Sequence, residues 1–255
     1  MTVRALARPS DAGDEAVERL RARASVLLPD GFEELEHDGR LQVVAYAESP
    51  AQLPAELGPW IVEAVESDWA ERWREFHHGR VIGERLWIGP PWEDAPAGLP
   101  SVVIDPGQAV GTGGHGSTRA TLELLASLPA SGAVLDLGCG SGVLSIAALR
   151  LGFDPVHACD IDPIAVEVTA ENAARNGLTL TPFVADAIAD PLPDVPLWIA
   201  NILRRPLEQL LARPDAPARA IVSGLVHDEQ LDAPDYRVGR RVVLDGWQAI
   251  LLERR

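Results

Sequence analysis

Sulfur-containing residues and long apolar runs are scarce in this sequence of 255 residues. Its two cysteines, Cys139 and Cys159, give no disulfide framework, so we expect a reducing compartment, the cytoplasm. No apolar run reaches the roughly 18 residues of a membrane-spanning helix. The opening segment "MTVRALARPSDAGDEAVERL" lacks the apolar core of a secretory signal. These absences exclude disulfide scaffolds and membrane spans, and we expect no membrane association.

Positive charge is also in short supply, with 22 Lys and Arg residues against 38 Asp and Glu residues and a net charge of −16. Such a surface repels phosphate backbones, so we expect no direct binding of nucleic acid. The charge would steer a basic protein towards the surface, but the same acidity would also serve solubility alone. We expect the chain to be a monomer.

The first part of the chain alternates short strand-like and helical segments. Strand patterns cover "TVRALAR" and "PWIVEAVE", a helix starts at Ser10 or Asp11, and Asp38-Gly39 forms the turn of a hairpin. A short helix is expected in "PAQLPAELG". The order strand-helix-strand-strand-helix-strand predicts a small α+β domain of the split βαβ, ferredoxin-like type over residues 1–66.

Residues 67–100 read as an interdomain helix and linker. Trp69, Trp73 and Phe76 recur at helical spacing, and five of the seven tryptophans lie between Trp60 and Trp92. Aromatic side chains dominate buried contacts, so we favour a packed junction between domains over a binding surface.

Residues 101–255 alternate apolar strands with helices. The strand-like segments include "AVLDLGCGSG", "PVHACDIDP", "PLWIANIL" and "RAIVSGLV". This alternation predicts an α/β domain with a mostly parallel, Rossmann-like sheet and helices on both faces.

A glycine-rich turn follows the strand that ends at Leu137. Its Gly138, Gly140 and Gly142 let a ligand approach the backbone, and the next strand ends in Asp160, an acid suited to a ribose diol. The dinucleotide fingerprint needs a further glycine where Val143 stands. A tight turn that binds no ligand is the alternative.

With Asp136 in front, the spacing D-x-G-x-G-x-G resembles the first motif of S-adenosylmethionine-dependent methyltransferases. In those enzymes the turn faces the methionyl part of the cofactor, and the acid holds the ribose hydroxyls.

A second glycine-rich stretch, "VGTGGHGSTR", precedes a predicted helix with Ser117 or Thr118 as its N-cap. Taken together with "DLGCGSG", "DIDP" and "ANIL", this stretch resembles the ribosomal protein L11 methyltransferase family. The upstream "LWIGPPW" is also similar to that family.

The resemblance implies a substrate-recognition domain, a linker and a methyltransferase domain. The implied reaction carries methyl groups from S-adenosylmethionine to amino groups of ribosomal protein L11, including lysine side chains and the N-terminal amine, and leaves S-adenosylhomocysteine. No metal is implied. Carried over by motif, the residues that match the family's cofactor-binding positions are Thr118, Gly138, Asp160 and Asn201. Thr112, Gly113, Asp136 and Gly140 are further candidates for binding the cofactor, and Asp186 stands where related methyltransferases often contact the adenine.

Two residues are candidates for the chemistry itself. The amide of Asn201 could accept a hydrogen bond from an incoming amine, or it could only cap the turn after its strand. His115 could orient the substrate or accept a proton, although loop histidines usually do neither. The glycines around His115 could form a movable lid or a plain flexible connector.

Departures from the family pattern leave the protein substrate open. The segment "HDEQLDAPD" is short where the family has a longer helix, and the first domain matches in pattern more than in residues. The alternatives are a methyltransferase for another protein or a small molecule, and a nonenzymatic module that binds the cofactor.

Overall fold

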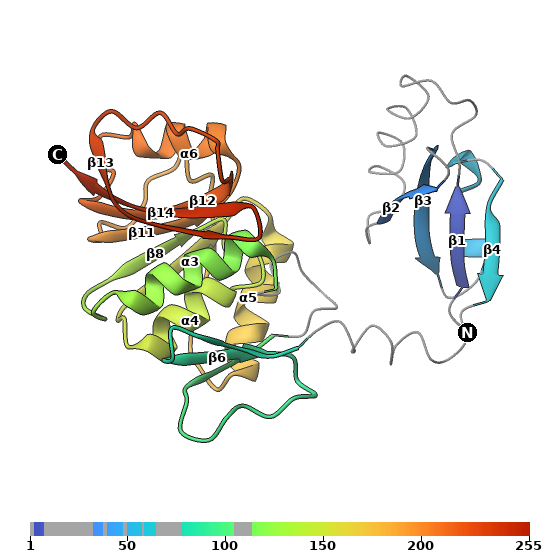
Figure 1. Ribbon diagram of the computed structural model, residues 1–255, viewed down its shortest axis with the longest axis horizontal. Helices are drawn as coiled ribbons and strands as arrows, with labels where there is room; N and C mark the ends of the chain where they lie inside the picture. Colours follow the sequence, from blue (N-terminus) through green and yellow to red (C-terminus); the bar gives the residue numbers. More distant parts are fainter. Residues whose placement is uncertain are drawn as a thin grey trace. The chain divides into compact units, whose positions relative to one another are not determined.

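The computed structural model describes residues 3–7, 33–37, 40–47, 50–57, 59–64, 78–104 and 114–255. The chain divides into two compact units, Met1–Phe76 and His77–Arg255 (Figure 1). The domain boundaries expected from the sequence, at residues 66 and 100, stay a prediction. Each unit is described by itself.

The first unit holds a four-stranded antiparallel sheet. Its strands are β1 (Val3–Ala7), β2 (Glu33–His37), β3 (Arg40–Ala47) and β4 (Ile61–Ala64), in the order β2-β3-β1-β4. The two inner strands are the first and third, as in a split βαβ unit. The helix expected after β1 and the Asp38-Gly39 turn lie outside the described residues.

The short helix expected between β3 and β4 is two 3-10 turns, η1 (Pro50–Gln52) and η2 (Ala55–Leu57). Pro54 stands between them and has no N–H to donate, so the helical hydrogen-bond pattern is interrupted there. Trp60 donates its Nε1–H to the Pro54 carbonyl at 2.8 Å. Its ring packs against the core that Leu53 forms with Ala5 and Ala45 of the sheet.

A seven-stranded sheet organises the second unit (Figure 1). Its strands are β8 (Val134–Leu137), β9 (Val156–Asp160), β10 (Phe183–Val184), β11 (Leu197–Asn201), β12 (Arg219–Val226), β13 (Tyr236–Leu244) and β14 (Trp247–Arg254). The order is β10-β9-β8-β11-β12-β14-β13. The first five of these are parallel, whereas β14 runs antiparallel to both β12 and β13. The expected mostly parallel, Rossmann-like sheet is confirmed.

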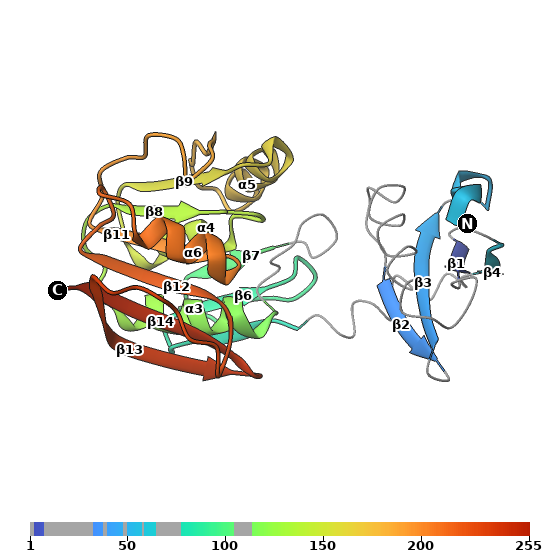
Figure 2. The ribbon, with the colours of Figure 1, turned by 90° about the horizontal axis from the view of Figure 1, so that it is seen from above.

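Alternating side chains send the sheet's apolar residues into two cores. Ile199 and Ile221 join one core with α3 (Gly116–Ser127), α4 (Val143–Leu151) and part of α5 (Pro163–Arg175). Trp198 and Val222 join the other with α6 (Arg204–Leu211). Figure 2 shows α6 on one face of the sheet, with α3 and α4 on the other. None of the helices in the described ranges combines the length and apolar character that crossing a bilayer requires.

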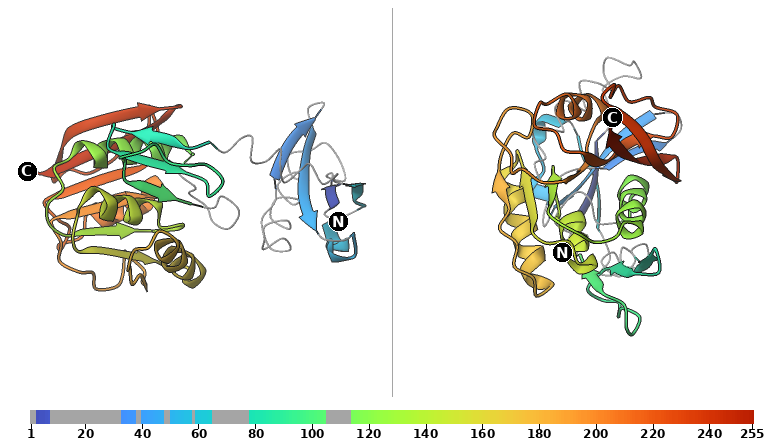
Figure 3. Two further views of the ribbon diagram at one scale, coloured as in Figure 1. Left: turned by 90° about the horizontal axis from the view of Figure 1, so that it is seen from below. Right: turned by 90° about the vertical axis from the view of Figure 1, so that its left-hand side faces the viewer.

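A small three-stranded sheet lies beside the first of these cores. It consists of β5 (Arg80–Ile82), β6 (Leu86–Gly89) and β7 (Ser101–Val103), and Figure 3 shows it in blue-green against the rest of the second unit. Its buried residues belong to the same apolar core as those of α3 and α4. Arg85 donates to the carbonyls of Ala126 and Leu128 at the end of α3. Residues 78–100, expected to serve as a linker, therefore pack within the second unit, while the helix expected at Trp69 and Trp73 lies outside the described residues.

Candidate active site

A cavity of about 840 Å³ opens at the carboxyl ends of the parallel strands. Much of its wall is formed by residues 137–141 at the end of β8, Asp160 at the end of β9, residues 185–188 after β10 and residues 201–203 at the end of β11. Strand order reverses between β8 and β11, and open α/β sheets bind ligands in the crevice at such a point. The volume falls within the roughly 300–1,000 Å³ of small-molecule sites.

The glycine turn after β8 forms the floor of this cavity. Gly138, Gly140 and Gly142 have φ of +75°, +54° and +78°, a region that favours glycine. A Cβ on Gly138 would lie 2.8 Å from Cγ2 of Ile202, so the side chain of Ile202, directly after β11, can pack against this turn only because Gly138 has no side chain. The Gly138 N–H also donates to the Cys159 carbonyl at 2.9 Å, which fastens the turn to β9.

Asp160 lies beside this turn at the end of β9. Its Oδ2 accepts from the Gly140 N–H at 3.0 Å, and its Oδ1 accepts from the Asp162 N–H at 3.0 Å. Each carboxylate oxygen can accept a further hydrogen bond, and a carboxylate has only acceptors to offer. The side chain is thus oriented by backbone and suited to a pair of hydroxyl donors in the cavity.

Asn201 and Thr118 meet on the wall of the same cavity, although 83 positions separate them in the sequence. The Asn201 Nδ2 donates to Thr118 Oγ1 at 3.1 Å, and Thr118 is almost fully buried at the start of α3. With Nδ2 directed to Thr118, Oδ1 is the amide atom that can accept from an incoming N–H.

His115 and Trp247 form another part of the wall. His115 is the N-cap of α3, where its Nδ1 accepts from the Ser117 N–H at 3.4 Å. Its ring lies 4.6 Å from that of Trp247, centroid to centroid, with 60° between the planes.

Sequence reasoning missed Trp247. Because β14 is antiparallel to β12, with Val226 opposite Trp247, the first residue of β14 lies at the edge where the parallel strands end. A tryptophan directly after the Asp245-Gly246 hairpin turn was the available signal.

Seven expected site residues line the cavity, namely His115, Thr118, Gly138, Gly140, Asp160, Asp186 and Asn201. Asp136 instead lies behind the wall, fully buried, with its Oδ2 accepting from Ser145 Oγ at 2.5 Å. Thr112 and Gly113 lie outside the described residues. The roles assigned to all ten stay predictions.

Burial raises the pKa of Asp136 from its ordinary 3.8 to about 6, against the lowering effect of the Ser145 hydrogen bond. A pKa raised by folding means that the protonated form stabilises the fold below pH 3.8 and that this contribution is lost as the pH rises to about 6. We therefore expect Asp136→Asn to increase stability by about 1–3 kcal/mol at pH 8. The gain should vanish below pH 3.8, and thermal melting across this range checks it. An equal effect at both extremes would show that the charge is not its cause.

The loop after β10 carries Asp186, one of the candidates for binding the cofactor. Asp186 Oδ1 accepts from the Ile188 N–H at 2.9 Å, and Asp190 Oδ2 accepts from the Asp186 N–H at 2.9 Å. The loop is therefore closed on itself, with Asp186 and Ile188 both on the cavity wall.

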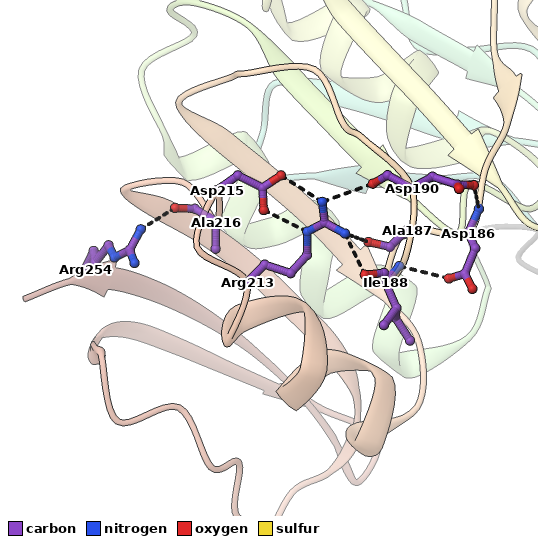
Figure 4. A network of polar contacts seen from close by, with 8 residues as sticks. All are labelled: Asp186, Ala187, Ile188, Asp190, Arg213, Asp215, Ala216 and Arg254. Carbon is purple, nitrogen blue, oxygen red and sulfur yellow. Dashed lines mark hydrogen bonds and ion pairs between the residues drawn. The ribbon is translucent and has the colours of Figure 1, made fainter.

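Arg213 holds this loop from outside the cavity (Figure 4). Its guanidinium donates to the carbonyls of Ala187, Ile188 and Asp190 at 2.7–3.0 Å. Two further bonds, at 2.8 and 2.7 Å, pair it with Asp215 in a bidentate arrangement and hold the pKa of that carboxyl below its ordinary value. The five N–H donors of the planar guanidinium thus serve three carbonyls and both oxygens of Asp215 at once, whereas Lys has only three donors.

Arg213→Met is expected to weaken, several-fold, the binding of the cofactor that the sequence resemblance implies, because the loop that lines the cavity loses three of its restraints. Calorimetry with S-adenosylhomocysteine measures the change. Arg254→Met is the matched control, since Arg254 donates to Ala216 at 2.6 Å and touches none of the loop carbonyls in Figure 4. Equal affinities for both variants would contradict a role for Arg213 in shaping the cavity.

A sequence model of the family described as ribosomal protein L11 methyltransferase matches residues 33–253. The chain belongs to this family. The resemblance found in the glycine-rich motifs is thereby confirmed.

Individual relatives agree with this assignment. A ribosomal protein L11 methyltransferase from Tolumonas auensis is 41% identical over 185 residues, which are 69% of this chain and 59% of the relative. A ribosomal protein L11 methyltransferase from Escherichia fergusonii is 41% identical over 178 residues, which are 66% of this chain and 59% of the relative. The chain therefore spans about three fifths of the length of these curated relatives. A crystal structure of a ribosomal protein L11 methylase from Lactobacillus delbrueckii subsp. bulgaricus has a TM-score of 0.62 and 27% identity, covering 70% of this chain and 99% of that one.

Proposed function

We propose that this chain is an S-adenosylmethionine-dependent protein N-methyltransferase whose acceptor is ribosomal protein L11. Its acceptor groups are amines, chiefly lysine side chains and also the N-terminal amine. The observation that carries the proposal is one cavity lined by an oriented carboxylate, Asp160, from the strand on one side of β8 and by an amide, Asn201, from the strand on the other side. Membership of the L11 methyltransferase family supports the choice of substrate. Action on a ribosomal protein would place the enzyme in the cytoplasm.

The residues of the cavity fit S-adenosylmethionine. Asp160 would accept from the ribose hydroxyls, the 186–188 loop would hold the adenine, and the turn at Gly138 and Gly140 would lie against the methionyl part. A side chain at Gly138 would fill this cradle and collide with Ile202. When bound, the cofactor supplies a methyl group already activated on a sulfonium.

The protein's contribution is then alignment and exclusion of water. A lysine has an ordinary pKa of about 10.4, and only the neutral amine attacks. An apolar wall lowers the pKa of an amine that enters it. Asn201 Oδ1 would accept from an N–H of that amine and so direct its lone pair, and His115 is our candidate for accepting the proton.

We assign recognition of L11 to the first unit, which we propose as the substrate-recognition domain. The net charge of −16 would attract a protein substrate that carries positive charge. We expect a monomeric enzyme that makes no direct contact with nucleic acid.

Methyl transfer from labelled S-adenosylmethionine to unmethylated ribosomal proteins tests the proposed function. Label is expected on L11 with the unmodified chain, and the Asp160→Ala and Asn201→Ala variants should lower it. Label on another protein or on a small amine would replace the substrate and keep the enzyme class. Tight binding of S-adenosylhomocysteine with no transfer to any acceptor would identify a nonenzymatic module.

A further inference from the structure

The strand order arranges the cavity along one direction. Asp160 and the 186–188 loop follow β9 and β10 on one side of β8, whereas Asn201, Gly224 and Trp247 belong to β11, β12 and β14 on the other. If the cofactor occupies the first side, as proposed above, the acceptor must enter over the second. We call the wall formed there by His115, Asn201, Leu203 and Trp247 the acceptor wall.

Trp247 is held firmly in the acceptor wall by α3. A Cβ on Gly116 would lie 2.8 Å from the Leu244 carbonyl oxygen and 3.0 Å from Trp247 Cδ1, so the first turn of α3 approaches this hairpin only as glycine. Arg119, one turn further on, pairs with Asp245 in the hairpin turn at 2.5 Å between Nη1 and Oδ2. Figure 1 shows β13 and β14 running past α3.

The chemistry of the acceptor wall favours an amine on an aliphatic stem. The carboxylates on the described lining, Asp160 and Asp186, both belong to the cofactor side. Around Trp247 the described lining is apolar or carries neutral amide and hydroxyl groups, apart from His115. Among the described residues of this wall, an arriving ammonium would therefore find no carboxylate to keep its proton in place, while an indole face attracts cations and packs against methylene groups.

Building on the proposed function, we propose that Trp247 is a specificity-determining residue that receives the acceptor amine. The indole holds the lysine side chain and its ammonium group until the amine loses its proton and turns to the methyl donor. The close contact of Trp247 with Gly116 and the ion pair between Arg119 and Asp245 in the adjoining hairpin turn fix the position of the ring. Trp247 should therefore govern affinity for the acceptor and leave affinity for the cofactor unchanged.

Steady-state kinetics with L11 and calorimetry with S-adenosylhomocysteine separate these two affinities. Trp247→Leu is expected to lower kcat/KM for L11 by about tenfold, within the range of a lost cation–π contact, with the cofactor affinity within twofold of the unmodified chain. Trp247→Phe, which keeps an aromatic face, should retain most of the kcat/KM of the unmodified chain for L11. Equal kinetics for Trp247→Leu and the unmodified chain would overturn the proposal, as would a parallel loss of cofactor affinity.

Two comparison variants sharpen the result. Ile161 is 68% exposed and lines the cofactor side, so Ile161→Ala should weaken S-adenosylhomocysteine and leave the KM for L11 unchanged. Val238 is 53% exposed on β13 and lies away from the cavity lining, so Val238→Ala should change neither quantity.

A binding measurement tests Trp247 independently of L11. Nα-acetyl-lysine methylamide is titrated into the complex of the chain with S-adenosylhomocysteine, and the NMR signal of the Trp247 indole N–H is followed. That signal is assigned as the one that disappears from the spectrum of the Trp247→Phe variant. A saturable shift of that signal is expected. An unmoved signal overturns the role of Trp247 even if L11 is methylated, whereas a shifted signal without transfer to L11 overturns only the proposed substrate.

Discussion

Replacing Asp160 with alanine is expected to weaken binding of S-adenosylhomocysteine by about 10- to 150-fold. The carboxylate lies on the cavity wall with both oxygens oriented by backbone N–H groups, so its hydrogen bonds to ribose hydroxyls need little rearrangement. Hydrogen bonds to a charged group contribute about 1.5–3 kcal/mol, which corresponds to that range. Calorimetry on the folded variant gives the affinity directly.

The neighbouring Asp162 provides the control. It caps α5 by accepting from the Ile164 N–H at 2.9 Å, and it is absent from the cavity lining. Asp162→Ala should cost about 1 kcal/mol of stability through the lost cap without changing the affinity. If both variants bind with unchanged affinity, Asp160 is not the ribose ligand.

Replacing Asn201 with alanine should lower the rate of a single turnover at saturating cofactor by at least about tenfold, or about 1.4 kcal/mol in the barrier. The reason is that the amide oxygen would direct the lone pair of the amine, a contact that Ala cannot make. Quenched-flow transfer of labelled methyl to L11 measures this rate. Some loss of cofactor affinity is also expected, because Asn201 lies on the same cavity wall as Asp160.

The Thr118→Val variant tests whether the orientation of the Asn201 amide matters for the rate, separately from the presence of the amide. Valine has nearly the shape of threonine but cannot accept from Asn201 Nδ2, so the amide remains while its restraint is lost. A smaller decrease in rate than for Asn201→Ala is expected. A normal rate for Asn201→Ala once the cofactor site is filled would show that the residue only holds the cofactor or the turn.

The residues at the strand ends could be predicted because parallel strands share one carboxyl edge. The motifs around Gly138, Asp160 and Asn201 each follow an apolar strand, and the sheet places them around one cavity. Asp136, in contrast, is the residue before the last one of β8. Because side chains alternate between the two faces of a strand, Asp136 points into the core, where Ser145 Oγ donates a hydrogen bond to it. A motif alone does not distinguish these two orientations.

Trp247 and Arg213 could not be predicted in the same way. Trp247 reaches the cavity because the last strand inserts antiparallel between β12 and β13, an arrangement that local periodicity does not determine. Arg213 donates to backbone carbonyls 23–26 positions away in the sequence. Every residue has such a carbonyl, so the sequence gives no sign of which ones Arg213 contacts. The interdomain helix expected around Trp69 and Trp73 stays a prediction.

The position of the transferred methyl group on L11 tests the central claim. Unmethylated L11 is incubated with the unmodified chain and labelled S-adenosylmethionine, treated with alkali, and digested for peptide mass spectrometry. The label should survive alkali and map to lysine side chains or the N-terminal amine. Label that alkali removes, or label confined to residues without an amino group, would contradict the claim that this cavity methylates amines.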